Sequence, residues 1–202
     1  MAIHSTDGEK WERRLGISTE AANFEKEDAA HCRYEPTSYA VLERLAASGF
    51  LKREDTLVDY GCGKGRVGFF LNYAVGLKTI GVEYNPMLFE MAQENLAGYA
   101  GKRNLVSFVC ENAETYEATG ANCFYFFNPF SVEILQSVLG RIFESWYAFP
   151  RHIYLFFYYA TDAYLTRLMT DDMLRFSGEI DCRDLFPGND PKEKITVFEL
   201  DC

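Results

Sequence analysis

Hydrophobic and polar positions along the chain predict strands that alternate with helices. Short apolar runs, which are typical of strands buried on both faces, predict strands over residues 56–60, 78–83, 105–110, 122–127 and 152–159. Between these runs we expect helices over residues 39–46, 66–74, 132–146 and 163–169. A further helix starts at Asn85-Pro86, because proline is favourable in the first helical turn. Such an alternation predicts βαβ units and a parallel sheet with helices on both faces.

The tail of the chain departs from this alternation. It carries two strand-like runs, over residues 174–181 and 194–200, which are joined by a strong turn signal at Phe186-Pro187-Gly188-Asn189-Asp190-Pro191. Without a helix between them, the two runs predict an antiparallel pair at one edge of the sheet. The expected fold class is therefore α/β, with three layers and a mostly parallel sheet that ends in an antiparallel C-terminal strand pair.

The N-terminal part differs from the rest in composition. Residues 1–30 are polar, charged and rich in alanine, and they lack a strong apolar stripe. We expect an N-terminal helical arm or lid over residues 1–35 and a core domain over residues 36–202. A chain of 202 residues is long enough to bury a sizeable core without disulfides or metals.

Composition and charge narrow the possible partners and the compartment. The net charge of −10 disfavours direct nucleic-acid binding and favours an amine, a small molecule or a basic protein. The longest apolar run, residues 153–160, is too short for a membrane span, and the polar N-terminus is not a secretory signal. The six cysteines form no C-x-x-C pair, so we expect no metal site and a cytoplasmic protein with reduced thiols. The oligomeric state is not predicted.

A glycine loop follows the first strand and carries the strongest functional signal. Asp59, Gly61, Gly63 and Gly65 form the pattern D-x-G-x-G-x-G at the end of that strand, where ligands bind in open α/β sheets. Glycines permit positive φ and allow a ligand to approach the backbone closely. The helix behind the loop supplies unpaired N–H groups.

A second interpretation of the same loop is an NAD site. Gly63-Lys64-Gly65-Arg66-Val67-Gly68 satisfies G-x-G-x-x-G, and Glu83 follows about 20 residues later, where an acid meets a ribose in either class of protein. Two features favour the first interpretation. The strand ends at Tyr60, so the tight turn starts at Gly61. The carboxylate of Asp59 suits a cationic amino group and disfavours a pyrophosphate.

Two motifs together resemble a known family. Val58-Asp59-Tyr60-Gly61-Cys62-Gly63-Lys64-Gly65-Arg66 resembles the first motif of class I S-adenosylmethionine-dependent methyltransferases, and Gly81-Val82-Glu83-Tyr84-Asn85-Pro86-Met87 resembles their second-strand signature. The resemblance covers about a fifth of the chain, by the lengths of these motifs and the helix after them. It implies the Rossmann-like methyltransferase fold and S-adenosyl-L-methionine as cofactor.

The resemblance also assigns the cofactor contacts. It implies that Asp59 and the loop residues Gly61, Cys62, Gly63 and Gly65 hold the methionine part of the cofactor. It implies that Glu83 accepts hydrogen bonds from both ribose hydroxyls, with Tyr84 beside it.

The adenine contact departs from the family pattern. The family often has Gly-Asp-Ala after the third strand, where this chain has Glu111-Asn112-Ala113. The resemblance places Asn112 and Ala113 at the adenine. An amide oxygen at Asn112 still accepts a hydrogen bond from an exocyclic amine.

A candidate substrate motif follows the fourth strand. Asn128-Pro129-Phe130 resembles the Asn/Asp/Ser-Pro-Pro-aromatic motif of amino-group methyltransferases but lacks its second proline. The resemblance implies that Asn128 accepts from a target amine and that Phe130 stabilises positive charge by cation–π attraction. The alternative is that Asn128-Pro129 only turns the chain after a buried strand.

Tyr34-Glu35-Pro36-Thr37 resembles a segment in bacterial methyltransferases that are distantly like the histone-lysine enzymes without a SET domain. The resemblance makes Tyr34 and Thr37 candidate lid residues over the cofactor. The alternative is that Thr37 or Ser38 caps the following helix. The aromatic run from Tyr154 to Tyr159 is interpreted as a buried central strand.

The sequence therefore predicts an S-adenosylmethionine-dependent methyltransferase that acts on nitrogen, in a protein or a small amine. Two alternatives stay open, an NAD-dependent oxidoreductase and a protein that binds S-adenosylmethionine without turnover. A nucleic-acid methyltransferase would need a basic partner or a recognition domain, which this chain lacks.

Overall fold

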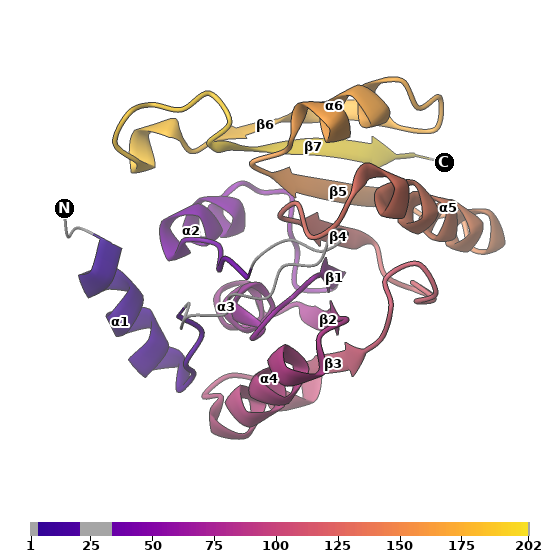
Figure 1. The fold of residues 1–202 in the computed structure, drawn as a ribbon. Coiled ribbons are helices and arrows are strands. Elements are labelled where there is room, and N and C mark those ends of the chain that lie inside the picture. Colours follow the sequence, from indigo (N-terminus) through magenta and orange to yellow (C-terminus); the bar gives the residue numbers. More distant parts are fainter. Residues whose placement is uncertain (1–3, 21–33, 202) are drawn as a thin grey trace.

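A seven-stranded sheet forms the centre of the protein (Figure 1). The computed structural model describes residues 4–20 and 34–201. The strand order is β3-β2-β1-β4-β5-β7-β6. The strands are β1 Thr56–Tyr60, β2 Lys78–Glu83, β3 Val106–Cys110, β4 Cys123–Phe126, β5 Ile153–Tyr158, β6 Arg175–Asp181 and β7 Lys194–Leu200.

The sheet is parallel except at its C-terminal edge. The first five strands pair in parallel, whereas β7 lies between β5 and β6 and pairs antiparallel with both. The connection from β6 to β7 holds a short 3₁₀ turn, η2 (Arg183–Leu185), and no helix long enough for a parallel crossover. The predicted mixed sheet with its antiparallel strand pair is confirmed.

The helices lie close to the predicted ranges. They are α1 His4–Leu15, α2 Tyr39–Ala47, α3 Arg66–Ala74, α4 Pro86–Gly98, α5 Val132–Ala148 and α6 Asp162–Met169, with a 3₁₀ turn η1 at Arg103–Leu105. The start of α4 follows from its sequence. Asn85 is the N-cap, its side-chain oxygen accepts a hydrogen bond from the N–H of Met87, and Pro86 occupies the first turn.

Two apolar cores cover the two faces of the sheet. Because side chains alternate along a strand, Leu57 of β1 belongs to one core and Val58 to the other. The core that contains Leu57 also holds buried residues of α2, α3 and α4, and the core that contains Val58 holds those of α5 and α6. The three predicted layers are therefore confirmed (Figure 1).

The aromatic run of β5 is core, as predicted. Phe156, Phe157 and Tyr158 are buried, and the hydroxyl of Tyr158 reaches the strand end, where it donates to Glu193. Within the described residues, no helix combines the length and the hydropathy needed to cross a membrane.

The N-terminal arm is more closely joined to the core than its sequence indicates. Leu15 and Ile17 are buried in the same core as α2 and α3, and the ring of Trp11 meets that of Phe70 edge-on. Figure 1 shows α1 beside these helices. The arm therefore docks without a strong apolar stripe, because three apolar side chains reach the core.

Candidate cofactor and substrate site

The glycine loop turns tightly at the end of β1. The N–H groups of Gly61 and Cys62 both donate to the carbonyl of Val82, at 2.9 and 3.2 Å. Gly61, Gly63 and Gly65 all have positive φ, and the N–H of Gly65 closes the turn on the carbonyl of Cys62. The turn therefore starts at Gly61, as predicted, and delivers the chain into α3.

Two of these glycines lie against other parts of the site. A Cβ atom on Gly61 would lie 2.5 Å from Cβ of Pro129, which follows β4. A Cβ atom on Gly63 would lie 2.2 Å from the ring of Tyr34. Both distances are shorter than non-bonded carbon atoms tolerate, so the loop needs glycine for space as well as for its positive φ.

We expect Gly61→Ala to lower the free energy of unfolding by about 2 kcal/mol or more, because it adds a clash to an unfavourable φ. Gly49→Ala is the matched control, since Gly49 also has positive φ but has open space around it. The control should cost about 1 kcal/mol, from the backbone alone. Urea unfolding measures both values. Equal losses in the two variants would contradict the close approach of Pro129.

Asp59 is a buried acid next to the loop. Its side chain is 3% exposed, and its Oδ2 atom has no hydrogen-bond partner among the described residues. Burial, together with the nearby charge of Glu83, raises the pKa of Asp59 well above its ordinary value. A buried carboxylate oxygen without a partner is costly, and a cationic ligand group would satisfy it.

Glu83 lies at the end of β2 and faces the glycine loop. Its Oε2 atom accepts from the N–H of Gly63 and its Oε1 atom from the N–H of Asn85, both at 2.8 Å. Tyr84, the next residue, is 53% exposed. The acid is thus oriented by two backbone groups, beside an exposed aromatic ring.

Asn112 and Ala113 begin the loop after β3, beside Glu83. The N–H of Glu111 donates to the carbonyl of Glu83 at 3.0 Å. The Asn112 side-chain oxygen accepts from the N–H of Glu114 at 2.9 Å, which closes a local turn. This oxygen has a second lone pair for a ligand. Ala113 is half-buried against the core that contains Val58.

Asn128 ties the ends of β4 and β5 together. Its side-chain N–H₂ group donates to the carbonyl of Tyr159 at 2.8 Å, and its oxygen accepts from the N–H of Thr161 at 3.3 Å. Both Asn128 and Tyr159 have positive φ. A strained backbone at the ligand-binding edge of a sheet is a frequent mark of function. The side chain also fixes a turn, so the two interpretations of Asn128 are not exclusive.

The ring of Phe130 is buried. Its side chain is 5% exposed and packs near the rings of Tyr60 and Phe126, and its carbonyl accepts from the hydroxyl of Tyr164. The ring therefore belongs to the core that contains Val58, and the cation–π role expected for Phe130 stays a prediction. The missing second proline is the sequence feature that separates this segment from the family motif.

Two acids of the tail reach the same edge and were not among the predicted site residues. The hydroxyl of Tyr159 donates to Asp190 at 2.7 Å, and that of Tyr158 donates to Glu193 at 2.6 Å. The antiparallel pairing of β5 with β7 brings the turn before β7 to the end of β5. The position of the two acids depends on the pairing of β7 with β5. The predicted antiparallel pair at the sheet edge was the sequence feature that pointed to it.

Tyr34 and Thr37 lie close to the glycine loop. The Tyr34 ring covers Gly63, and its hydroxyl donates to the carbonyl of Thr19 at 2.5 Å. The Thr37 hydroxyl is buried, 3.1 Å from that of Tyr125. Ser38 is the N-cap of α2 but makes no side-chain capping bond. Ser38 thus occupies the N-cap position that the alternative predicts, through its carbonyl and not its side chain, and Thr37 lies before the helix.

The described residues contain no group of three or more His, Cys, Asp or Glu side chains that would hold a metal ion. The four described cysteines in residues 34–201 are free thiols, and Cys32 and Cys202 lie outside the described residues.

Known proteins match this chain through structure. No family model matches it, and no curated protein matches its sequence. An RNA methyltransferase from Salinibacter ruber, solved with S-adenosyl-L-homocysteine, is 20% identical, with a TM-score of 0.51 over 82% of this chain and 92% of that chain. A TehB-like SAM-dependent methyltransferase from Corynebacterium glutamicum is 16% identical, with a TM-score of 0.55 over 80% of this chain and 88% of that chain.

A third structure is the tRNA (uracil-54, C5)-methyltransferase of Pyrococcus abyssi with S-adenosyl-L-homocysteine. It is 16% identical, with a TM-score of 0.58 over 81% of this chain and 38% of that chain. This chain has the fold of class I S-adenosylmethionine-dependent methyltransferases. The resemblance predicted from two short motifs is thereby confirmed at the level of the fold. Two of these three methyltransferases are named for an RNA acceptor, so they do not support the predicted nitrogen acceptor in a protein or small amine.

Proposed function

We propose that this protein binds S-adenosyl-L-methionine over the glycine loop and transfers its methyl group to an acceptor held beside Asn128. The observation that carries the proposal is the buried carboxylate of Asp59, whose Oδ2 atom has no partner in the described residues. It lies beside a loop of three glycines with positive φ, at the edge of the sheet where the parallel strands end.

The site has groups for each part of this cofactor. Asp59 suits the cationic amino group of the methionine part, and the loop residues Gly61 to Gly65 suit its close approach. Glu83 suits the ribose hydroxyls, because a carboxylate oxygen can accept more than one hydrogen bond and two backbone N–H groups orient this one. The exposed ring of Tyr84 and the turn at Asn112-Ala113 suit the adenine, and Tyr34 and Thr37 cover the methionine end.

The same features weigh against the two alternatives. A pyrophosphate would place negative charge beside the buried Asp59, which opposes NAD binding. Gly68, the last glycine of the NAD pattern, lies within α3, where a Cβ atom would be 3.2 Å from the Thr79 hydroxyl. Helix packing thus accounts for it without a ligand. In a binding protein without turnover, the side chain of Asn128 would serve only to join the ends of β4 and β5.

When bound, S-adenosyl-L-methionine supplies an electrophilic methyl group on a sulfonium. The residues of this chain then need only to align an acceptor and exclude water. The second lone pair of the Asn128 side-chain oxygen orients a donor group of the acceptor. Tyr34 packs against Gly63 and Pro129 against Gly61, so both side chains exclude water from the glycine loop.

We propose a nitrogen acceptor, in a protein or a small amine. The part of the acceptor that binds this protein carries positive charge. The net charge of −10 and the acids Asp190 and Glu193 near Tyr159 support a cationic acceptor. The same charges weigh against direct nucleic-acid binding. Because similar folds act on RNA, RNA must be tested as well.

The test is a methyl-transfer assay with S-adenosyl-L-methionine labelled in the methyl group. Basic proteins, small amines and structured RNA serve as three separate acceptor pools. Label on an amine or a lysine-rich protein supports the proposal. Label on RNA alone would contradict the proposed acceptor but would support methyl transfer. Cofactor binding without label in any pool would favour the binding protein.

We expect Asn128→Gly to lower kcat by about a hundredfold, while the affinity for S-adenosyl-L-homocysteine stays within about threefold. Glycine tolerates the positive φ at this position, so the variant removes the side chain without adding backbone strain. The matched control is Asn189→Gly, which makes the same change at another positive-φ asparagine. Steady-state kinetics measure both variants. An unchanged kcat in Asn128→Gly would leave Asn128 with the turn role alone.

A further inference from the structure

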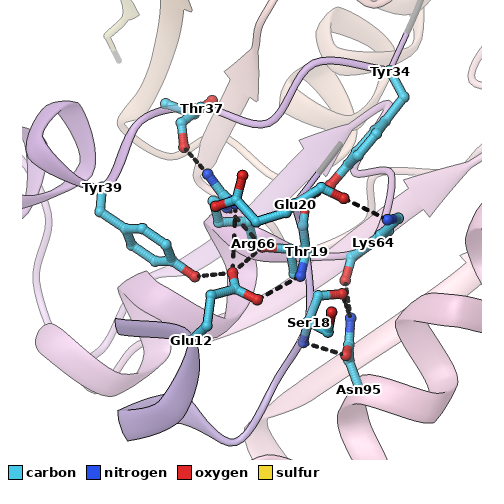
Figure 2. A network of polar contacts seen from close by, with 10 residues as sticks. All are labelled: Glu12, Ser18, Thr19, Glu20, Tyr34, Thr37, Tyr39, Lys64, Arg66 and Asn95. Carbon is cyan, nitrogen blue, oxygen red and sulfur yellow. Dashed lines mark hydrogen bonds and ion pairs between the residues drawn. The ribbon is translucent and has the colours of Figure 1, made fainter. Parts of the chain in front are cut away.

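Arg66, the first residue of α3, is a buried cation outside the proposed set of cofactor contacts. Its side chain is 5% exposed. Its Nε atom donates to the Thr19 hydroxyl at 2.7 Å, and its two terminal nitrogens donate to the carbonyl of Thr37 at 3.2 Å and the carboxylate of Glu20 at 2.8 Å. The guanidinium also lies over the ring of Tyr39. Figure 2 shows Arg66 at the centre of these groups.

Glu12 of α1 joins the same network from the other side. One of its oxygens accepts from the hydroxyls of Tyr39 and Thr19 and lies 3.4 Å from Arg66, and the other accepts from the N–H of Thr19 (Figure 2). Glu12 and Arg66 are thus two nearly buried charges that enclose Thr19. We call the group Glu12, Thr19, Glu20, Thr37, Tyr39 and Arg66 the Arg66 clasp.

The clasp is continuous with the glycine loop. The Lys64 ammonium donates to the carbonyl of Glu20 at 2.6 Å, and the Tyr34 hydroxyl donates to the carbonyl of Thr19. The side-chain N–H₂ group of Asn95 donates to the carbonyls of both Lys64 and Ser18, at 3.1 Å each (Figure 2). Any displacement of residues 18–20 therefore disturbs three contacts of the loop and of the ring that covers Gly63.

Apolar side chains outside the clasp also hold α1 to the core. Leu15 and Ile17 anchor the arm by apolar burial. Neither residue belongs to the clasp. The buried charges add direction to that anchoring, since a guanidinium offers five donors in a rigid fork. The guanidinium of Arg66 can therefore fix the orientation of residues 18–20 in addition to holding them to the core.

We propose that Arg66 is a positioning residue that holds residues 18–20 and Tyr34 closed over the glycine loop and so sets how long the cofactor stays bound. Arg66 contacts none of the reacting atoms and acts through Thr19 and Tyr34. The kinetic part of this inference rests on the proposed cofactor. The structural part, a loop held closed by a buried cation, does not.

The test compares Arg66→Lys and Tyr34→Phe with wild type. Lysine keeps the charge but has a single nitrogen in place of the three guanidinium nitrogens that bond to Thr19, Thr37 and Glu20. Phenylalanine keeps the ring on Gly63 and loses only the bond to Thr19. Glu9→Gln is the matched control, because it alters an exposed acid of α1 outside the clasp.

Two readouts are measured on the full chain, well below the melting temperature. We expect S-adenosyl-L-homocysteine to dissociate about tenfold faster from Arg66→Lys and several-fold faster from Tyr34→Phe, with amide hydrogen exchange of residues 61–65 accelerated by similar factors. In turnover, KM for the cofactor rises in Arg66→Lys, and kcat at saturation of this variant stays within about twofold of wild type. A loss of global stability alone would lower the melting temperature and accelerate exchange throughout the core strands, whereas the proposal predicts a larger acceleration at residues 61–65 than in those strands.

Wild-type dissociation and exchange rates in both folded variants would overturn the proposal. If Arg66→Lys does not fold, Tyr34→Phe decides the matter by the same readouts. If wild type binds no S-adenosyl-L-homocysteine, the proposed function fails, and faster exchange of residues 61–65 in the variants still supports the clasp, whereas unchanged exchange overturns it.

Discussion

Replacement of Glu83 by alanine is expected to weaken S-adenosyl-L-homocysteine binding by at least about a hundredfold, because hydrogen bonds to a charged group contribute about 1.5–3 kcal/mol each and two to the ribose are lost. The variant also leaves the N–H groups of Gly63 and Asn85 without their acceptor, so the loop loses part of its own support. Isothermal titration calorimetry measures the change in Kd.

Glu90→Ala is the matched control for this variant. Glu90 is an exposed acid of α4, seven residues after Glu83, and its replacement by alanine makes the same change in charge. We expect its Kd to equal that of wild type. Circular dichroism should show both variants folded. A Kd for Glu83→Ala within threefold of wild type would contradict the assignment of the ribose to this carboxylate.

Replacement of Asp59 by asparagine is expected to affect stability and binding in opposite directions. The free protein should gain about 1 kcal/mol or more of stability at neutral pH, because a buried carboxylate oxygen without a partner is exchanged for a neutral group. Binding of S-adenosyl-L-homocysteine should weaken by at least about tenfold, because its amino group loses an ionic partner. Urea unfolding and calorimetry measure the two effects.

The pH dependence of wild type checks the same assignment. Burial raises the pKa of Asp59, so the folded state holds this proton to a higher pH than the unfolded state does. The contribution of Asp59 to stability is therefore fully present below its unfolded pKa of about 3.9 and is lost as pH rises through the raised folded value. In Asp59→Asn this loss should be absent. A variant with the stability profile and affinity of wild type would contradict a buried, ligand-directed acid at this position.

Most of the fold was predictable because its central strands are buried on both faces. The short apolar runs at 56–60 and 78–83 were assigned as buried strands, and the structure has strands over the same ranges. The antiparallel edge was predictable for another reason, since the segment between residues 181 and 194 has no helical pattern that would support a crossover. The boundaries that shifted, such as the end of α5 at Ala148, lie where a helix frays into a loop.

The candidate site was predictable only where local sequence determines geometry. The turn at Gly61 follows from the glycines themselves and from the strand that ends at Tyr60. By contrast, Phe130 lies next to Asn128 in sequence, yet tertiary packing buries its ring. Arg66 is a comparable case, because a basic residue in a helix is usually exposed and only the fold brings Glu12 and Thr19 to it.

The acceptor depends on parts of the molecule that sequence patterns describe poorly. Asp190 belongs to a turn whose composition predicts only a change of direction, and it reaches Tyr159 through the pairing of β7 with β5. The acids at this edge favour a cationic acceptor, whereas two of the three compared structures of this fold are named for RNA substrates. The acids at this edge of the sheet therefore predict the charge of the acceptor, which the fold alone does not.

The most direct test of the central claim is calorimetric titration of the purified protein with S-adenosyl-L-homocysteine and, in parallel, with NAD. Micromolar binding of S-adenosyl-L-homocysteine without binding of NAD is the predicted result, and it would leave only the acceptor to be identified. Binding of NAD with no response to S-adenosyl-L-homocysteine would contradict the account and make Gly63, Gly65 and Gly68 the dinucleotide-binding glycines.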